Sequence, residues 1–308
     1  MGRSRWGLVQ VSLAGVLWGT GGLVMQLIRD REPLSVLTVS AWRMLLAALA
    51  LLLALALARG YADVTALLRR SPGTAIFVGC CTGAYQALYF AAVLAVGVTV
   101  STVVALGLAP TLLTLAESMR ARRLPSLARV LPLVAALVGL VLVSASAGLA
   151  TTGPQPVLGM LLAAASGSTY AAATAVGRPL TASAGPLALT AVTSTAGAVL
   201  LLPLALAGGG PYLPCSPEVT GLLVYLGVAT LAVAYALLYA GLRTVSGAAA
   251  LIATLLEPVT AAVLAAALLG ERLALVGIVG AAFILLAVAG LEQGEESSGP
   301  VPGGLVPR

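Results

Sequence analysis

Two charged residues stand deep within long apolar stretches of this sequence, Arg43 in the second stretch and Glu257 in the ninth. A charge at the centre of a membrane-spanning helix costs about 2.5–3.5 kcal/mol on an insertion scale, so such a residue faces protein or water. Glu257 could bind a substrate ammonium group or carry a coupling proton, and Arg43 could bind a carboxylate. Alternatively, the two form a structural ion pair, or Arg43 reaches outward to the membrane surface.

Four tyrosines form two pairs with i, i+4 spacing, Tyr85 with Tyr89 and Tyr235 with Tyr239. This spacing puts both rings of a pair on one face of a helix. If these stripes line a cavity, Tyr85 and Tyr235 would contact substrate, while Tyr89 would narrow the outer exit and Tyr239 the inner one. The alternative is an aromatic belt at the lipid interface.

Further candidates lie near the same depth. Trp18, Thr20 and Gln86 could contact substrate as aromatic or polar groups. Pro110 and Pro258 stand at equivalent places within two apolar stretches, where a proline removes a backbone hydrogen bond and bends a helix. We expect these two prolines to act as hinges or to shape the walls of a cavity, although static kinks that only affect packing are an equal alternative.

The composition shows which elements must position these residues. The 308 residues are 60% hydrophobic and only 8% charged, whereas soluble domains carry about 25% charged residues. A spanning helix needs about 20 mainly apolar residues. This pattern predicts an all-α integral membrane protein with ten transmembrane helices, at 6–27, 34–58, 73–94, 98–118, 127–146, 156–177, 185–207, 218–240, 246–268 and 273–291.

The chain also contains an internal repeat. The tyrosine pair recurs with a shift of 150 residues, and Thr20 and Arg29 recur as Thr169 and Arg178 with a shift of 149. Each copy holds five predicted helices, and an odd number turns the second copy over in the bilayer. We therefore expect two inverted five-helix repeats, 6–146 and 156–291, with a binding site between them, as in many secondary transporters.

The arginines predict the orientation, because cytoplasmic loops carry an excess of positive charge. With the N-terminus inside, the outer side receives only Arg29, Arg31 and Arg272. The inner side then collects Arg3, Arg5, Arg59, Arg69, Arg70, Arg120, Arg122, Arg123, Arg129, Arg178 and Arg243. We expect a multi-pass protein of the cell (cytoplasmic) membrane with both termini in the cytoplasm.

Other site chemistry finds little support in the residue types. The sequence has no His, and its three cysteines, Cys80, Cys81 and Cys215, provide no metal-ligand set. We expect no catalytic residues, no metal and no cofactor. We also expect no nucleic-acid partner, because the net charge of +6 resides in arginines that set the topology. Expected partners are a small-molecule substrate, the lipid bilayer and protons as a coupling ion, with the chain a monomer or homodimer. Residues 299–308 resemble the remnant of a thrombin cleavage site, which we place outside the fold.

Several motifs resemble the EamA-type families of the drug/metabolite transporter superfamily. They are Leu17-Trp18-Gly19, Glu257-Pro258 and the turn Leu269-Gly270-Glu271-Arg272, and the resemblance covers about residues 7–291. It implies a ten-helix carrier whose central cavity is built by helices 1–4 and 6–9. Members export amino acids and other small metabolites, or carry nucleotide sugars and phosphorylated sugars. The first copy departs from the pattern, with Ala109 and Arg123 at the positions of Glu257 and Glu271.

These observations favour a secondary transporter that exports amino acids or similar amphipathic metabolites by alternating access around a midplane cavity. An acid, an arginine and several tyrosines suit a zwitterion, whereas phosphorylated substrates usually require clusters of basic groups. The alternative within transport is efflux of cationic or hydrophobic drugs that depends on Glu257 alone. A non-transporting receptor or scaffold is the alternative from another class, and an intramembrane enzyme is disfavoured because the aspartates fall in loops.

Overall fold

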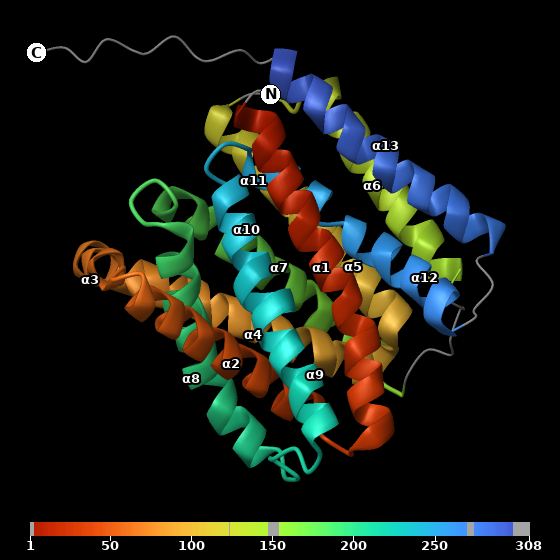
Figure 1. The fold of residues 1–308 in the computed structure, drawn as a ribbon. Coiled ribbons are helices and arrows are strands. Elements are labelled where there is room, and N and C mark those ends of the chain that lie inside the picture. Colours follow the sequence, from red (N-terminus) through yellow and green to blue (C-terminus); the bar gives the residue numbers. More distant parts are fainter. Residues whose placement is uncertain (1–2, 123, 147–153, 270–273, 298–308) are drawn as a thin grey trace, which may run out of the picture.

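The computed structural model describes residues 3–122, 124–146, 154–269 and 274–297, and within them it contains helices and no strand (Figure 1). Among these residues, nine helices are long and apolar enough to span a membrane, and the apolar part of α13, Leu275–Leu291, adds a shorter tenth. This confirms the predicted all-α membrane class. In chain order the helices are α1 (Arg3–Arg31), α2 (Val36–Leu57), α3 (Tyr61–Arg70), α4 (Pro72–Val96), α5 (Val98–Ala121), α6 (Leu127–Ser146), α7 (Pro156–Leu180), α8 (Pro186–Ala207), α9 (Pro217–Gly227), η1 (Val228–Val233), α10 (Ala234–Gly241), α11 (Gly247–Ala253), α12 (Leu256–Leu269) and α13 (Leu275–Ser297).

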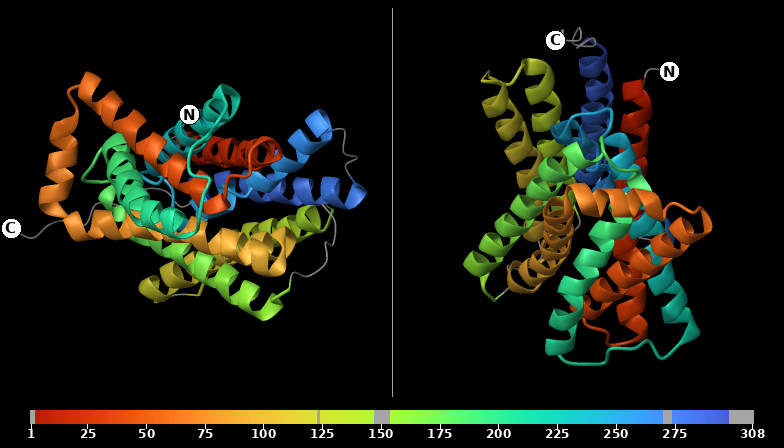
Figure 2. Two further views of the ribbon diagram at one scale, coloured as in Figure 1. Left: turned by 90° about the horizontal axis from the view of Figure 1, so that it is seen from below. Right: turned by 90° about the vertical axis from the view of Figure 1, so that its left-hand side faces the viewer.

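The two halves pack against each other through equivalent pairs of helices. Helix α7 of the second half packs on α4 and α5, and its equivalent α1 packs on α10 and α12. The second helices of the halves, α2 and α8, contact each other, as do the last helices, α6 and α13, which run together along one side (Figures 1 and 2). This exchange of partners is the arrangement expected of two inverted repeats.

Small residues allow the central helices to approach one another closely. A Cβ atom at Gly167 of α7 would lie 2.5 Å from the carbonyl oxygen of Ala105 in α5. At Gly19 of α1 it would lie 2.5 Å from the carbonyl oxygen of Glu257 in α12. Lipid is as apolar as leucine, so such backbone contacts drive helix association in a membrane. The Gly19 contact also fixes the position of Glu257 relative to α1.

Two spanning helices of the second half are irregular. The eighth contains the π-helical segment η1 between α9 and α10, and the ninth is interrupted at Thr254 and Leu255, just before Pro258. Helix α5 continues without interruption past Pro110. The paired prolines therefore differ, since the helix is interrupted next to only one of them. Irregular backbone at membrane depth is tolerated where it is enclosed by protein or lines a cavity.

One helix was not predicted. The connection that carries Arg59, Arg69 and Arg70 contains the ten-residue helix α3, which has Asp63 in its first turn and Arg69 and Arg70 in its last. These charges are placed favourably for the helix dipole, with the acid at the N-terminus and the bases at the C-terminus. Arg123, the Glu271-Arg272 turn and residues 299–308 lie outside the described residues, so the predictions made for them stay predictions.

A candidate substrate cavity between the two halves

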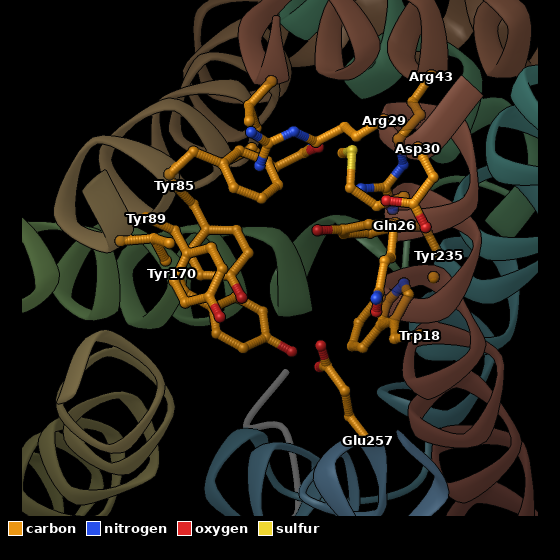
Figure 3. Close-up of a pocket in the computed structure, with 17 residues that line it drawn as sticks. Trp18, Gln26, Arg29, Asp30, Arg43, Tyr85, Tyr89, Tyr170, Tyr235 and Glu257 are labelled. Carbon is orange, nitrogen blue, oxygen red and sulfur yellow. The ribbon is translucent and has the colours of Figure 1, made fainter. Parts of the chain in front are cut away.

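A cavity of about 620 Å³ lies between the halves, within the usual size range of small-molecule sites (Figure 3). Its walls come from α1, α2, α4, α7, α10 and α12, so both repeats contribute. The lining residues are Trp18, Gly21, Gly22, Met25, Gln26, Arg29, Asp30, Val36, Arg43, Tyr85, Gln86, Tyr89, Phe90, Val93, Tyr170, Tyr235 and Glu257. Seven of these are among the candidates predicted from the sequence.

Arg43 and Glu257 face the cavity from opposite ends. Figure 3 shows the Arg43 side chain at one end and the Glu257 carboxylate at the other, with aromatic rings between them. No ion pair joins the two within the described part of the chain, where the closest acid–base contacts are Arg31 with Glu218 and Arg129 with Glu117. Both side chains are half-buried and line the cavity, which leaves each charged group able to bind a ligand.

The π-helical segment η1 holds Arg43 in position. The Nη2 group of Arg43 donates a hydrogen bond of 3.1 Å to Oγ1 of Thr230, which in turn donates to the carbonyl oxygen of Leu226 at 2.7 Å. One turn earlier, Gly227 packs directly on the backbone of α2, where a Cβ atom would lie 3.2 Å from the Arg43 carbonyl oxygen. The Nε atom of Arg43 is buried and has no hydrogen-bond partner among the described residues. A buried donor without a partner is costly, so a ligand acceptor at this point would satisfy it.

Four aromatic rings from four helices make a continuous wall between the two charges. The ring of Tyr85 stacks on that of Tyr170 with centroids 4.8 Å apart, and Tyr170 meets Trp18 edge-on at 6.3 Å. Trp18 contacts Tyr235 at 5.0 Å. This geometry offers apolar faces together with phenol hydroxyl groups, a combination that suits amphipathic ligands.

The remaining tyrosine of each pair extends this wall in opposite directions. Tyr89 stacks on Tyr85 at 6.3 Å, lines the cavity and shares a hydrogen bond of 2.7 Å with the Thr102 hydroxyl. Tyr239 lies 6.2 Å from Tyr235 but is only 2% exposed and does not line the cavity. The two predicted gates therefore differ in this structure, with Tyr89 in contact with the cavity and Tyr239 packed in the protein.

The cavity is open at one end. Its lining includes the exposed residues Gln26, Arg29 and Asp30 near the C-terminal end of α1, which is the outer side in the predicted orientation. Asp30 and Glu257 are the acidic members of the lining and lie at different ends (Figure 3). The described residues contain no group of three or more His, Cys, Asp or Glu side chains that could hold a metal ion.

Two polar candidates from the sequence are placed differently. Gln86 is 6% exposed, lines the cavity, and has an Oε1 atom without a partner among the described residues. Thr20 does not line the cavity. Its hydroxyl group lies 2.8 Å from that of Tyr225 and donates to the Leu17 carbonyl oxygen at 2.7 Å. Its side chain turns toward α9 and away from this cavity, and a contact between Thr20 and substrate stays a prediction.

Sequence reasoning missed Tyr170 and Thr230. Tyr170 follows Thr169, the repeat partner of Thr20, but its own partner in the first copy is Gly21, so the repeat gave no sign of an aromatic residue there. Thr230 is one threonine among many, and an isolated hydroxyl group in an apolar helix is usually bonded to its own backbone. A search for rings opposite small residues in the other copy would have found Tyr170.

Comparisons with known proteins agree with this arrangement. A Bacillus subtilis (strain 168) protein described as the uncharacterized transporter YwfM is 29% identical over 229 residues, which cover 74% of this chain and 73% of that protein. A solved crystal structure has the same fold, with a TM-score of 0.78 at 19% identity over 96% of this chain and 99% of that chain. The family model of EamA-like transporters matches twice, at residues 5–145 and 157–292. The chain therefore belongs to the EamA-like transporter family, within the drug/metabolite transporter superfamily.

Proposed function

We propose that this transporter exports amino acids or similarly small amphipathic metabolites from the cell. The observation that supports this substrate class is the unpaired placement of Arg43 and Glu257 at opposite ends of one cavity. A zwitterion presents a carboxylate to the arginine and an ammonium group to the acid. An apolar side chain would lie against Trp18, Tyr85 and Tyr235, whose rings form the wall between the two charges.

The proposed mechanism is alternating access around this cavity in the cytoplasmic membrane, with both termini in the cytoplasm. In that orientation the cavity opens outward through Arg29 and Asp30, while Tyr239 is packed in the protein on the inner side. An outward-open conformation is the one from which an exporter releases its substrate. Rocking of the inverted halves would then expose the same residues to the cytoplasm.

A second candidate function is efflux of cationic aromatic or hydrophobic compounds. The observation that favours it is the continuous series of rings from Tyr89 to Tyr235, with Glu257 at one end. Aromatic faces attract cations by about 0.5–2 kcal/mol each, and more strongly when water is excluded. In this case Arg43 would not contact the substrate, so the two candidate functions predict different effects of removing it.

Transport by the purified protein in liposomes tests both functions. Uptake of labelled leucine, phenylalanine and threonine would be compared with uptake of a quaternary ammonium dye. We expect amino-acid uptake by the wild type and much slower uptake by Arg43→Ala and Glu257→Gln, with both variants folded. Dye transport that survives in Arg43→Ala and fails in Glu257→Gln would support cation efflux instead. Normal amino-acid uptake by both variants would contradict the proposed role of the two charges.

Coupling to protons belongs to the same proposal. Glu257 is the carboxyl group at the enclosed end of the cavity, so it is the group best placed to exchange a proton as access alternates. An imposed pH gradient should therefore accelerate uptake by the wild type. The variant Glu257→Gln should show residual uptake that no longer responds to the gradient, whereas Asp30→Asn, at the mouth, should keep the response.

A further inference from the structure

Two arginines that the repeat makes equivalent, Arg29 in α1 and Arg178 in α7, have different surroundings. The Nε group of Arg178 donates a hydrogen bond of 3.1 Å to the carbonyl oxygen of Val245, which joins α7 to the turn between α10 and α11. Arg29 lines the open mouth of the cavity, and its side chain has no hydrogen-bond or ion-pair partner among the described residues. One position is thus bonded while its equivalent is free.

The residues around the two arginines show the same contrast between an open and a closed end. On α1, Gly22 and Met25 line the cavity. Their equivalents on α7, with the shift of 149 that relates Arg29 to Arg178, are Ala171 and Thr174, which are 5% and 2% exposed. If the open end at α1 and the closed end at α7 exchanged their states, the residues around Arg29 would become buried as those around Arg178 are in this structure.

The helix ends identify the partner that Arg29 would then meet. Ser246 is the N-cap of α11, and Gly97 stands at the N-cap of α5 with the same shift of 149. The residue before each cap is a buried valine, Val245 on the closed side and Val96 on the open side. The carbonyl oxygen of Val96 thus corresponds to the oxygen that Arg178 contacts.

The charge distribution supports a role for Arg29 beyond setting topology. Arginines are concentrated on the predicted inner side, where Arg178 lies and where the bias in loop charge is sufficient to explain it. Arg29 lies on the outer side, against that bias. Its side chain also lines the mouth of the cavity (Figure 3).

We propose that Arg29 and Arg178 are alternating latches, each of which closes its own side of the transporter through a backbone carbonyl. In the outward-open form, Arg178 holds α7 to Val245 and Arg29 is free. In the inward-open form, Arg178 leaves Val245, and Arg29 donates to the carbonyl oxygen of Val96 and so holds α1 to the turn between α4 and α5. This inference rests on the alternating access proposed above and assigns residues that stabilise each of its two states.

The test measures how accessible each side is, without any substrate. Two reporter positions are changed to cysteine, one per protein, after Cys80, Cys81 and Cys215 are replaced by serine. Gln26→Cys reports the outer side, because Gln26 is exposed in the cavity, and Ala175→Cys reports the inner side, because Ala175 is packed against the cluster around Leu113 and Leu251. The rate of labelling by a maleimide is measured on purified protein.

The effect of each arginine variant is measured at the reporter cysteine on the opposite side of the membrane, so the lost charge is far from the cysteine that is labelled. Arg29→Ala should slow labelling of Ala175→Cys by about 3- to 10-fold, because one hydrogen bond that stabilises the inward-open form is lost. Arg178→Ala should slow labelling of Gln26→Cys, because the outward-open form loses its latch. Arg178→Lys should restore much of that rate, and Arg243→Ala, which removes an exposed arginine from the same inner side, should leave it unchanged.

Two results would overturn the proposal, and they differ in what they imply. If labelling responds to Arg178→Ala but not to Arg29→Ala, only Arg178 stabilises one of the two states, and the exchange of latches is wrong while alternating access stands. If Ala175→Cys remains unlabelled in every folded variant, and transport in liposomes is also absent, alternating access itself is wrong. Opposite shifts produced by the two arginine variants would support the latches.

Discussion

Thr230 accepts a hydrogen bond from Arg43 at 3.1 Å, and it does so from the π-helical segment of the eighth spanning helix. The same hydroxyl donates to Leu226, so its lone pairs point toward the guanidinium group. π-Helical turns are rare and occur often at functional sites. Here the segment turns a threonine toward one of the two arginines that line the cavity, and Thr230 is therefore a positioning residue for Arg43.

The variant Thr230→Val tests this role, since it keeps the shape of the side chain and removes the hydroxyl group. A hydrogen bond to a charged group is worth about 1.5–3 kcal/mol, so KM for a transported amino acid should rise about 10-fold or more, with little change in the maximal rate per folded protein. Uptake kinetics in liposomes would measure it. The amide of the same amino acid, which lacks the carboxylate, should show no such rise.

Thr190→Val is the matched control for Thr230→Val. Thr190 is also fully buried and bonds its own helix, through the Pro186 carbonyl oxygen at 2.7 Å, but it accepts no hydrogen bond from Arg43, whose Nη2 bonds to Thr230. Thr230→Ser should behave like the wild type. An equal loss of affinity for the amino acid and its amide would argue against a role through Arg43.

A pair of glycines on α1 predicts opposite effects of the same substitution. A Cβ atom at Gly19 would lie 2.5 Å from the Glu257 carbonyl oxygen and 2.6 Å from Cβ of Thr260, whereas one at Gly22 would meet nothing within 4 Å. Overpacking of this kind costs about 1–3 kcal/mol, so Gly19→Ala should lower the thermal unfolding temperature and move Glu257. Gly22→Ala should leave it unchanged or raise it, because alanine favours the helix by up to about 1 kcal/mol.

Thermal unfolding in one detergent, with both variants side by side, would measure the difference. Gly22 serves as the control for Gly19 because both lie on the same helix, three residues apart. A similar loss of stability in the two variants would contradict the close contact between α1 and α12.

Hydrophobic length and the repeat were sufficient to predict most of the fold. The ten stretches correspond to the spanning helices within a few residues, since twenty apolar residues leave few other structures available in a membrane. The repeat and the depth of Arg43 and Glu257 also indicated residues that the structure brings to one cavity. The depth of a residue in the membrane can be predicted from the sequence because the thickness of the bilayer fixes the length of a spanning helix.

Facing direction was harder to predict than depth. The repeat match with Thr169 indicated the depth of Thr20 but not the direction of its side chain, which turns toward Tyr225. Each step of one residue rotates a side chain by about 100° around a helix, so residues at similar depth can face different neighbours. The π-helical turn that points Thr230 at Arg43 leaves the apolar pattern of the helix unchanged, so the sequence carries no sign of it. The interruption next to Pro258 but not Pro110 depends on packing around each proline, which the residue type alone does not determine.

The connection between α8 and α9 predicts a dependence of stability on pH. The Glu32 carboxylate accepts hydrogen bonds from the backbone N–H groups of Cys215, at 3.1 and 3.0 Å, and Ser216, at 2.9 Å. The Cys215 N–H above all, and also Ser216, stabilises the ionised form and lowers the pKa of Glu32 below its usual value near 4.5. The stabilisation is therefore fully present above pH 4.5 and is lost as the pH falls through the lower pKa of the folded state.

Glu32→Gln should accordingly be less stable than the wild type at pH 7, with a difference that shrinks as the pH is lowered below about 4.5. Unfolding temperatures of both proteins between pH 3 and pH 7 would measure it. Asp30→Asn is the control, because Asp30 is an exposed neighbour on the same side. A difference that stays constant over this range would show that Glu32 acts through its shape rather than its charge.

The second tyrosines of the two repeated pairs, Tyr89 and Tyr239, predict unequal consequences of the same truncation. Tyr239 is 2% exposed, and its ring lies against that of Tyr235 with centroids 6.2 Å apart. Removing a buried ring costs about 3–5 kcal/mol, so Tyr239→Ala should lower the unfolding temperature strongly and open the inner side. Tyr89 lies at the cavity wall, where water can fill the space left by its ring, so Tyr89→Ala should be much less destabilising.

Leak of preloaded substrate from liposomes distinguishes a residue that closes the inner side from one that only packs in the core. If Tyr239 closes the inner side, liposomes that contain Tyr239→Ala should lose preloaded substrate without a gradient, while those that contain Tyr239→Phe, which keeps the ring, should retain it. Tyr89→Ala should not leak, because the inner side stays closed in the outward-open form. A Tyr239→Ala protein that is less stable but does not leak would make Tyr239 a core residue, and the closure of the inner side would then depend on α7 and the turn at Val245.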